Sequence, residues 1–284
     1  MERIGVVGCG LMGSGIAEIA ARAGADVIVI ERDQNAIASG QARIEKSLSR
    51  AVASGKVPEN EANEARGNLL FSDDFSRLAD RELVIEAVAE DESTKVEVFE
   101  KLDAVLKDPS AILATNTSSI PIIKLAMVTK RPEQVIGMHF FNPVPVLKLV
   151  ELISSLLTSA ETTTRVTEYA TTALKKRVIT SPDRAGFVVN ALLIPYLLSA
   201  VRMLESGFAS AEDIDTGMVV GCAHPLGPLA LSDLIGLDTT LAVAESLYAE
   251  FKEPHMAPPP LLSRMTQAGL LGRKSGQGFY SYKS

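Results

Sequence analysis

The stretch VVGCGLMGSGIAEIAARAG, residues 6–24, sets how the first half of this chain folds. Its glycines stand at positions 8, 10 and 13, directly after an apolar run and directly before a helical pattern. In such a loop Gly8 permits a tight turn, Gly10 lets the backbone approach a pyrophosphate, and Gly13 lets the helix pack closely on the sheet. The first N–H groups of the helix attract phosphate. The stretch therefore predicts a strand, a loop and a helix that bind a dinucleotide.

An acidic residue closes the next predicted strand, DVIVIE at residues 26–31. Glu31 lies 21 residues after the second glycine of the loop, near the separation expected for a carboxylate that binds a ribose. Such a carboxylate accepts a hydrogen bond from the 2′-hydroxyl of NAD and repels the 2′-phosphate of NADP. Arg32 could attract that phosphate, so NADP stays open as the weaker alternative to NAD. Leu11 and Met12 complete the expected cofactor-binding loop.

Short apolar runs alternate with helical patterns through the first half of the chain. The runs of strand length lie at residues 4–8, 26–31, 83–88, 111–116, 135–141 and 148–153. They are rich in valine and isoleucine, and helical patterns such as those at residues 16–24 and 96–106 separate them. Strands that alternate with helices indicate βαβ units and a parallel sheet.

The second half is helical in pattern. Residues 187–207 have the length of a helix, with Pro195 as an expected kink and Gly207 at the end. Further helical segments lie at residues 211–220, 228–234, 238–251 and 260–268, and a strand pattern appears at 278–282. We expect an α/β protein, in which a Rossmann-type, mostly parallel sheet domain (residues 1–184) precedes an all-α domain (residues 185–284).

The composition excludes several classes of function. The 284 residues have a net charge of −7, which argues against nucleic acid or an anionic membrane as a partner. No apolar run approaches the roughly 18 residues of a membrane span. The first strand begins by Ile4, which leaves no room for a signal peptide and favours a cytoplasmic protein. Cys9 and Cys222 form no CxxC pair and there are three histidines, so we expect neither a disulfide framework nor a metal site.

A histidine and a glutamate indicate acid–base chemistry. His139 ends the predicted strand VIGMHFF, and ligands of open α/β sheets bind beyond the carboxyl ends of strands. If the chain turns near Pro145 and the two strands run antiparallel, His139 and Glu151 are equidistant from the turn and lie opposite each other. A carboxylate beside an imidazole sets its tautomer and stabilises its protonated form, as a general base requires. On spacing alone, a histidine bonded to a backbone carbonyl is an equal alternative.

Two polar features in apolar surroundings allow more than one interpretation. NTSS, residues 116–119, follows a predicted strand, and a hydroxyl or amide there could hold a substrate oxygen. Helix capping is the commoner role of these residue types. Asn190 interrupts the apolar stretch FVVNALL, and a buried amide needs hydrogen-bond partners. It therefore completes a local network or faces a cleft between the domains.

Several motifs together resemble a known family. They are GxGxxG at 8–13, IEAVAED at 85–91, ATNTSSI at 114–120, GMHFFNPVPVLKLVE at 137–151, GFVVN at 186–190, HPLGPLALSDLIGLD at 224–238 and GRKSGQGFYSY at 272–282. Their order and residues resemble the L-3-hydroxyacyl-CoA dehydrogenase family, in its short monofunctional form, the 3-hydroxybutyryl-CoA dehydrogenases. The resemblance spans essentially the whole chain, and HFFNPVPVxKLVE is highly specific.

The resemblance implies NAD-dependent interconversion of a short-chain (S)-3-hydroxyacyl-CoA and its 3-oxoacyl-CoA. By it, His139 is the base for the C3 hydroxyl and Glu151 is its orienting partner. Ser118 contacts the substrate oxygen and the cofactor, and Asn190 helps to hold the substrate from the helical domain. That domain is also expected to bind the acyl-CoA and to form a homodimer.

The resemblance also implies a set of ligand contacts around the sheet. Glu90, Lys95 and Asn142 match positions that line the nicotinamide-ribose side of the cofactor. The segment from Ser47 to Lys56 looks like the helical arm that meets coenzyme A, although a solvated surface lysine is an equal interpretation of Lys56.

The chain departs from the family pattern PGFVxNR at two positions. Ala185 stands in place of the proline and Ala191 in place of the arginine, which puts acyl preference and domain packing in doubt more than the reaction. The length leaves no room for a fused hydratase. A dehydrogenase of a free hydroxy acid or sugar acid is the nearer alternative function. A non-catalytic NAD-binding sensor is remote, because the His139 and Glu151 pair is present.

Overall fold

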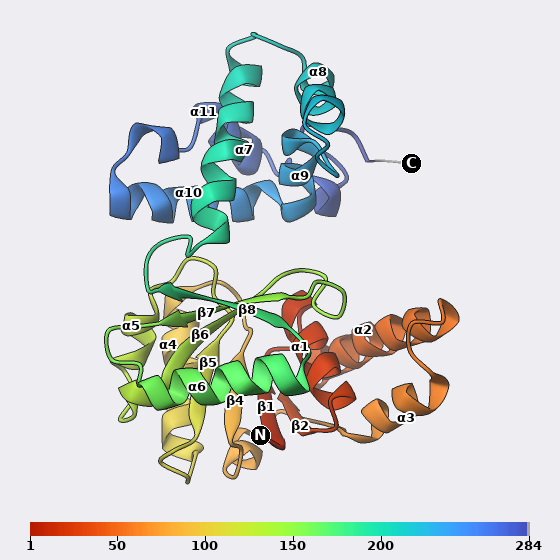
Figure 1. Cartoon of the computed structure of the whole chain (residues 1–284), viewed down its shortest axis with the longest axis vertical. Helices are drawn as coiled ribbons and strands as arrows, with labels where there is room; N and C mark the ends of the chain where they lie inside the picture. Colours follow the sequence, from red (N-terminus) through yellow and green to blue (C-terminus); the bar gives the residue numbers. More distant parts are fainter. Residues whose placement is uncertain (283–284) are drawn as a thin grey trace. The chain divides into compact units, whose positions relative to one another are not determined.

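The computed structural model describes residues 1–282 and divides the chain into two units, of which the first is Met1–Arg184 and the second begins at Ala185. Each unit has its own apolar core. Figure 1 labels the helices of both units and most strands of the first.

One sheet forms the centre of the first unit, with its strands in the order β3-β2-β1-β4-β5-β6-β7-β8. The strands are β1 (Arg3–Val7), β2 (Asp26–Ile30), β3 (Leu69–Ser72), β4 (Leu83–Glu86), β5 (Ile112–Thr115), β6 (Val135–Phe140), β7 (Leu149–Ser154) and β8 (Arg177–Pro182). Neighbours pair in parallel except β6 and β7, which are antiparallel. The predicted Rossmann-type sheet is confirmed. The strands β2 and β3 lie on one side of β1, and β4 and β5 lie on the other, so the strand order reverses between β1 and β4. Ligands of such sheets bind at this reversal, beyond the carboxyl ends of β1 and β4.

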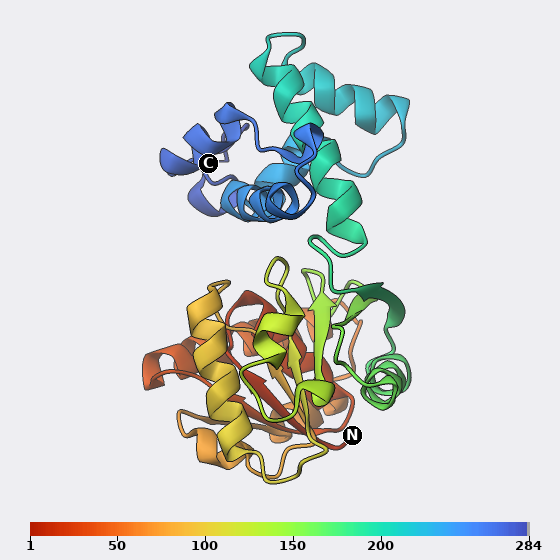
Figure 2. The same ribbon diagram turned by 90° about the vertical axis from the view of Figure 1, so that its left-hand side faces the viewer.

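Helices cover both faces of this sheet. They are α1 (Leu11–Arg22), α2 (Gln34–Ala53), α3 (Glu59–Gly67), α4 (Glu92–Val105), α5 (Ile122–Ala126) and α6 (Ala160–Glu168), with short helical turns at Phe75–Leu78, Pro132–Gln134 and Tyr169–Ala173. In Figure 2, α4 in yellow and α6 in green lie on opposite sides of the sheet. Helix α1 belongs to the same face as α6, because Ile16 of α1 and Val166 of α6 share one core cluster.

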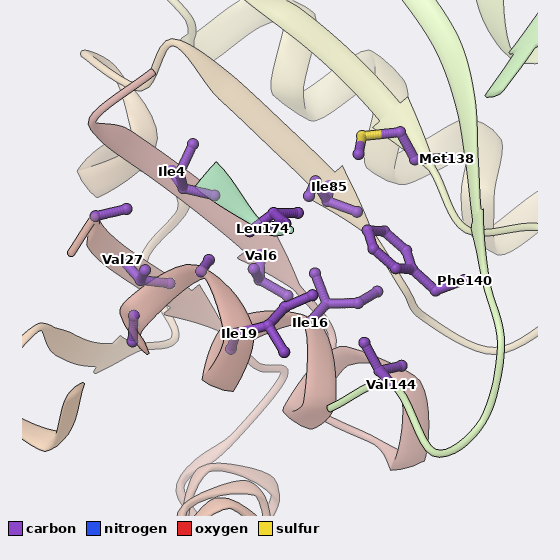
Figure 3. Close-up of a cluster of buried hydrophobic side chains, with 14 of the residues drawn as sticks. Ile4, Val6, Ile16, Ile19, Val27, Ile85, Met138, Phe140, Val144 and Leu174 are labelled. Atoms are coloured by element: carbon purple, nitrogen blue, oxygen red, sulfur yellow. The ribbon is translucent and has the colours of Figure 1, made fainter. Parts of the chain in front are cut away.

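The core under α1 connects the glycine loop with the later strands, as Figure 3 shows. Ile16 of α1 packs in one cluster with Val6 of β1, Phe140 of β6 and Val144 from the turn after β6. A Cβ atom on Gly15 would lie only 2.8 Å from the Cβ of Val144. The turn between β6 and β7 therefore packs directly on the helix that follows the glycine loop.

Two strands, β3 and β8, were not predicted from the sequence. Both lie at the edges of the sheet. Each has only one buried residue, and its other residues are exposed or half-buried. Continuous apolar runs are typical of strands that are buried on both faces, and edge strands lack this signal.

The second unit is built from helices α7 (Val189–Glu205), α8 (Ala211–Thr216), α9 (Pro228–Ile235), α10 (Leu237–Phe251) and α11 (Pro260–Gln267), with short helical turns at Gly217–Gly221, Pro254–Met256 and Arg273–Ser275. Their apolar residues form a separate core cluster around Leu197, Leu229 and Leu247. Helix α7 continues through Pro195 and ends before Gly207, which has a φ of +70°. No helix among residues 1–282 combines the length and apolar character that crossing a membrane requires.

The strand predicted at residues 278–282 is wrong. Only isolated bridges join this segment to its neighbours. The carboxylate of Asp233 accepts hydrogen bonds from the N–H groups of Phe279 at 3.0 Å and Tyr280 at 2.9 Å. A buried side chain thus satisfies donors that a strand would pair with another strand.

Candidate active site

The glycine loop has the geometry of a ligand cradle made from backbone. Gly8 has a φ of +89°, and a Cβ on it would lie 2.7 Å from the carbonyl oxygen of Ala87. A Cβ on Gly13 would overlap the carbonyl oxygen of Gly8. A Cβ on Gly10, by contrast, would meet no atom within 4 Å. Packing inside the protein therefore requires glycine at positions 8 and 13, whereas the space beside Gly10 is open to a ligand.

Helix α1 presents free donors beside this space. Gly10 is its N-cap, and no side chain caps the first turn. Uncapped N–H groups at a helix N-terminus point at a ligand and favour negative charge. Leu11 is exposed there, while Met12 packs against the core. This donor set fits the pyrophosphate of NAD.

Glu31 directly follows β2 and reaches back to the glycine loop. Its carboxylate accepts hydrogen bonds from the backbone N–H groups of Cys9 at 2.6 Å and Arg32 at 3.1 Å. The Arg32 guanidinium donates to Asp33 at 3.1 Å, so a neighbouring carboxylate already engages it. These contacts favour NAD over NADP, because a phosphate would meet a fixed carboxylate and an occupied arginine.

The two cysteines lie in different environments. Burial raises the pKa of Cys9 to about 12, and the nearby Glu31 carboxylate adds to the shift. The thiolate that would react or bind a metal is therefore not formed at neutral pH. Cys222 is exposed. Within residues 1–282, no three His, Cys, Asp or Glu side chains gather in an arrangement that could hold a metal ion.

His139 and Glu151 lie opposite each other in the antiparallel pair of β6 and β7, so the predicted register is confirmed. The Nδ1 atom of His139 is 2.7 Å from Oε2 of Glu151, and both side chains are buried. Because a carboxylate only accepts hydrogen bonds, Nδ1 carries the hydrogen in this contact. In the neutral ring, Nε2 is then the acceptor, which is the state of an oriented general base.

Ser118 brings a hydroxyl to the other nitrogen of the same ring. Its Oγ lies 3.1 Å from Nε2 of His139, to which it donates in the tautomer just described. The ring of Phe141 packs against the imidazole, with centroids 4.7 Å apart. A substrate oxygen that approaches Nε2 would therefore also meet the Ser118 hydroxyl.

The NTSS segment does not cap the helix that follows it, so the capping interpretation is wrong. Helix α5 begins at Ile122, and the N–H groups of Ile122 and Ile123 donate to the carboxylate of Asp183 at 2.9 and 2.8 Å. The amide oxygen of Asn116 accepts a hydrogen bond from the N–H of Phe140 at 2.9 Å. A distant residue thus supplies the cap, and the segment is tied to β6 instead.

The carboxylate of Glu90 accepts several hydrogen bonds from the NTSS segment. Its Oε1 accepts hydrogen bonds from the N–H groups of Ser118 at 2.8 Å and Ser119 at 3.0 Å, and from the Thr117 hydroxyl at 2.5 Å. Its Oε2 lies 3.3 Å from Nζ of Lys95. Burial opposes ionisation, but Lys95 and these hydrogen bonds outweigh it and hold the pKa of Glu90 below its usual value. Glu90 is therefore a carboxylate at neutral pH.

Sequence reasoning missed Glu86, which is fully buried at the end of β4. Its carboxylate accepts hydrogen bonds from Nζ of Lys95 at 2.6 Å, Oγ1 of Thr115 at 2.6 Å and the N–H of Val88 at 2.7 Å. A charged residue at the end of an apolar strand was the available signal, because buried charges need partners. Polar contacts therefore continue from β4, across the NTSS segment, to the histidine of β6.

A buried lysine, also missed, holds the turn between β6 and β7. Nζ of Lys176 donates to the carbonyl oxygens of Val144 at 2.6 Å and Leu147 at 2.5 Å. Burial lowers the pKa of Lys176, and the positive charge of Arg22 lowers it further. The lysine secures the turn that joins the strand of His139 to that of Glu151.

The other predicted residues lie elsewhere, and their roles stay predictions. Asn142 is exposed directly after β6. Ser47 on α2 is half-buried, and Lys56 is exposed after α2. Asn190 is half-buried in the first turn of α7, in the second unit.

Two family models match the chain. The model described as "3-hydroxyacyl-CoA dehydrogenase, NAD binding domain" matches residues 3–184. The model described as "3-hydroxyacyl-CoA dehydrogenase, C-terminal domain" matches residues 186–282. Together they cover both units of the structure.

Relatives and solved structures agree with this match. A 3-hydroxybutyryl-CoA dehydrogenase of Mycobacterium tuberculosis is 58% identical over 282 residues, which are 99% of this chain and 99% of that protein. The crystal structure of M. tuberculosis FadB2 has a TM-score of 0.98 at 58% identity and covers 100% of this chain and 99% of its own. That of (S)-3-hydroxybutyryl-CoA dehydrogenase PaaH1 from Ralstonia eutropha has a TM-score of 0.94 at 44% identity and covers 100% of both chains.

Proposed function

The chain belongs to the 3-hydroxyacyl-CoA dehydrogenase family, and from this we propose that it interconverts short-chain (S)-3-hydroxyacyl-CoA and 3-oxoacyl-CoA with NAD as cofactor. The observation that supports the proposal most directly is the continuous contact of Glu151, His139 and Ser118. The names of the relatives support 3-hydroxybutyryl-CoA as the first substrate to test.

In the proposed mechanism, His139 is the general base. NAD, when bound, supplies the hydride acceptor for C3 of the substrate. Nε2 of His139 takes the proton of the C3 hydroxyl in oxidation and returns it to the forming alkoxide in reduction. Glu151 holds the ring through Nδ1 and stabilises its protonated form. The hydroxyl of Ser118 donates to the same substrate oxygen and positions it beside Nε2.

The cofactor would lie across the carboxyl ends of the strands. The glycine loop and the first turn of α1 would hold its pyrophosphate, and Glu31 the ribose on the adenine side. Glu90 lies in the loop between β4 and α4, Lys95 lies in the first turn of α4, and both would line the nicotinamide ribose together with Asn142.

Substrate binding and assembly extend the proposal to other parts of the chain. Ser47 and Lys56 would contact coenzyme A, and Asn190 would hold the acyl part from the second unit. The second unit would also form a homodimer, since it exposes large apolar side chains such as Phe208 (79% exposed) and Val220 (78% exposed). Sedimentation of the purified protein tests this directly, and a monomer at micromolar concentration would contradict it.

The deciding experiment measures NADH oxidation with acetoacetyl-CoA, beside free acetoacetate and beside NADPH. We expect rapid oxidation of NADH only with the thioester. Equal rates with free acetoacetate would favour a hydroxy-acid dehydrogenase instead. NADH binding without turnover of either compound would contradict the proposed reaction while leaving the nucleotide site intact.

A further inference from the structure

Two carboxylates, Glu86 and Glu90, contact one ammonium group, that of Lys95; Glu86 and Lys95 are buried, whereas the side chain of Glu90 is 35% exposed. Lys95 lies 2.6 Å from Glu86 and 3.3 Å from Glu90, and its side chain is only 1% exposed. Glu86 accepts hydrogen bonds from Nζ of Lys95, Oγ1 of Thr115 and the N–H of Val88. The two carboxylates share one ammonium group, so the cluster has one negative charge more than it has positive charges.

The strand order places this cluster under one half of the cofactor. The glycine loop after β1 holds the pyrophosphate, and Glu31 after β2 lies on the adenine side. The other nucleotide must therefore extend over the ends of β4 and β5 toward His139 on β6. Glu86 ends β4, and its partner Thr115 ends β5. The nicotinamide half of a bound cofactor would then lie on the side of this cluster.

The oxidised and reduced cofactors differ in charge at this half. The nicotinamide ring has a positive charge in NAD⁺ and none in NADH. In a buried site, where charges interact more strongly than in water, a net negative charge nearby stabilises NAD⁺ selectively. Without Glu86, the cluster would contain one ammonium and one carboxylate and would lose this preference.

We propose that Glu86 supplies the excess negative charge that makes this site bind NAD⁺ more tightly, relative to NADH, than the same site without it. The proposal rests on the NAD site described under the proposed function. Glu86 does not contact the cofactor in this proposal but acts on it through Lys95 and through the electrostatic potential of its charge. It is therefore a positioning residue. Because it stabilises the oxidised cofactor, it makes hydride transfer from bound NADH to the 3-oxoacyl group more favourable.

The test is Glu86→Gln, with dissociation constants of NAD⁺ and NADH measured separately by calorimetry, without acyl-CoA. We expect the ratio of the NAD⁺ constant to the NADH constant to rise roughly three- to tenfold. Glutamine fits the site, because its oxygen can accept from Lys95 and Val88 while its amide donates to Thr115, whose hydroxyl can also accept.

The matched control is Thr115→Val, which removes a hydrogen bond to Glu86 without changing charge. It should leave the ratio unchanged even if both affinities fall, because loosening the site affects both cofactors alike. Glu90→Gln removes one negative charge from a less buried position and should raise the ratio in the same direction, which preserves the test if Glu86→Gln does not fold.

An unchanged ratio in Glu86→Gln, or the same change in Thr115→Val, would overturn the proposal. The readout does not depend on turnover, so failure of the acetoacetyl-CoA assay leaves it interpretable. Failure of the wild-type protein to bind either cofactor would overturn the NAD site itself, and this inference with it.

Discussion

The carboxyl edge of the sheet is built in two different ways. At β1 and β2, the site consists of backbone: the glycine turn, the uncapped start of α1 and the single carboxylate of Glu31. At β4 to β7, it consists of side chains, most of them buried, that are in contact from Glu86 to Glu151. The first side is suited to hold a phosphate, and the second to move a proton.

This difference decides how each side responds to substitution. The backbone side depends on the absence of side-chain atoms, so an added methyl group damages it. The part of the site at β4 to β7 depends on side chains whose charges compensate one another. Removing one of them therefore leaves a buried charge or an unpaired donor. Substitutions at β1 and β2 should therefore change cofactor affinity, whereas substitutions at β4 to β7 should change the rate of the chemical step.

The largest effect is expected on the side-chain side, from His139→Ala. Turnover with acetoacetyl-CoA should fall by about 10² to 10⁴, because the proton acceptor is lost. NADH affinity should stay within a small factor of the wild type, since the glycine loop is untouched. His255→Ala, at an exposed histidine of the second unit, is the control and should retain full turnover. Unchanged kcat in His139→Ala would remove this residue from the mechanism.

The next prediction distinguishes two glycines of the nucleotide loop, of which one matters for stability and the other for cofactor binding. Gly13→Ala should lower the free energy of unfolding by about 1–3 kcal/mol, because its Cβ would overlap the carbonyl oxygen of Gly8. Gly10→Ala should keep wild-type stability but weaken NADH binding by roughly tenfold, the scale of one lost hydrogen bond to a charged group. Thermal unfolding and calorimetry measure the two quantities. Equal destabilisation by both variants would contradict the distinction drawn between the two glycines.

Glu151→Gln should have a smaller effect than His139→Ala and a distinct signature. Turnover should fall roughly tenfold to a hundredfold, because a hydrogen bond to a charged group is replaced by a neutral one. The pH–rate profile of hydroxyacyl oxidation should differ from that of the wild type, since the carboxylate bonded to Nδ1 of the imidazole is replaced by an amide. A profile identical to the wild type would show that Glu151 only packs against His139.

Glu31→Ala should give the smallest effect. We expect kcat/KM for NADPH, relative to NADH, to rise by at most about tenfold, because the repulsive carboxylate is removed but Arg32 remains paired with Asp33. Adding Asp33→Asn should increase the gain by freeing the guanidinium. No change in the NADPH to NADH ratio in either variant would argue against a ribose contact by Glu31.

Much of this architecture could be predicted locally. Glycine spacing, an apolar run and a following acid are signals within about 25 residues, and they indicated the nucleotide loop and Glu31. The register of His139 and Glu151 was predicted on the assumption that the chain turns near Pro145, because antiparallel strands then place residues equidistant from the turn opposite each other.

Other parts had no local signal. Asp183 caps α5 from a position distant in the chain, and Asp233 replaces a strand partner for Phe279 and Tyr280. The edge strands β3 and β8 each have only one buried residue. In each case a side chain or strand satisfies backbone groups that are neighbours only after folding.

By itself, the sequence determined a dinucleotide-binding α/β unit and a helical second unit, because both follow from periodicity or spacing along the chain. For His139 and Glu151 it predicted only that they lie opposite each other if the chain turns near Pro145, and the structure decided that they bond. Only the tertiary structure decided that Glu86 and Glu90 share Lys95, that Ser118 meets His139, and that Lys176 holds the turn between β6 and β7. The physical reason is the cost of burying charge. Every buried ion must find its partner, and folding, not chain order, brings the partner within reach.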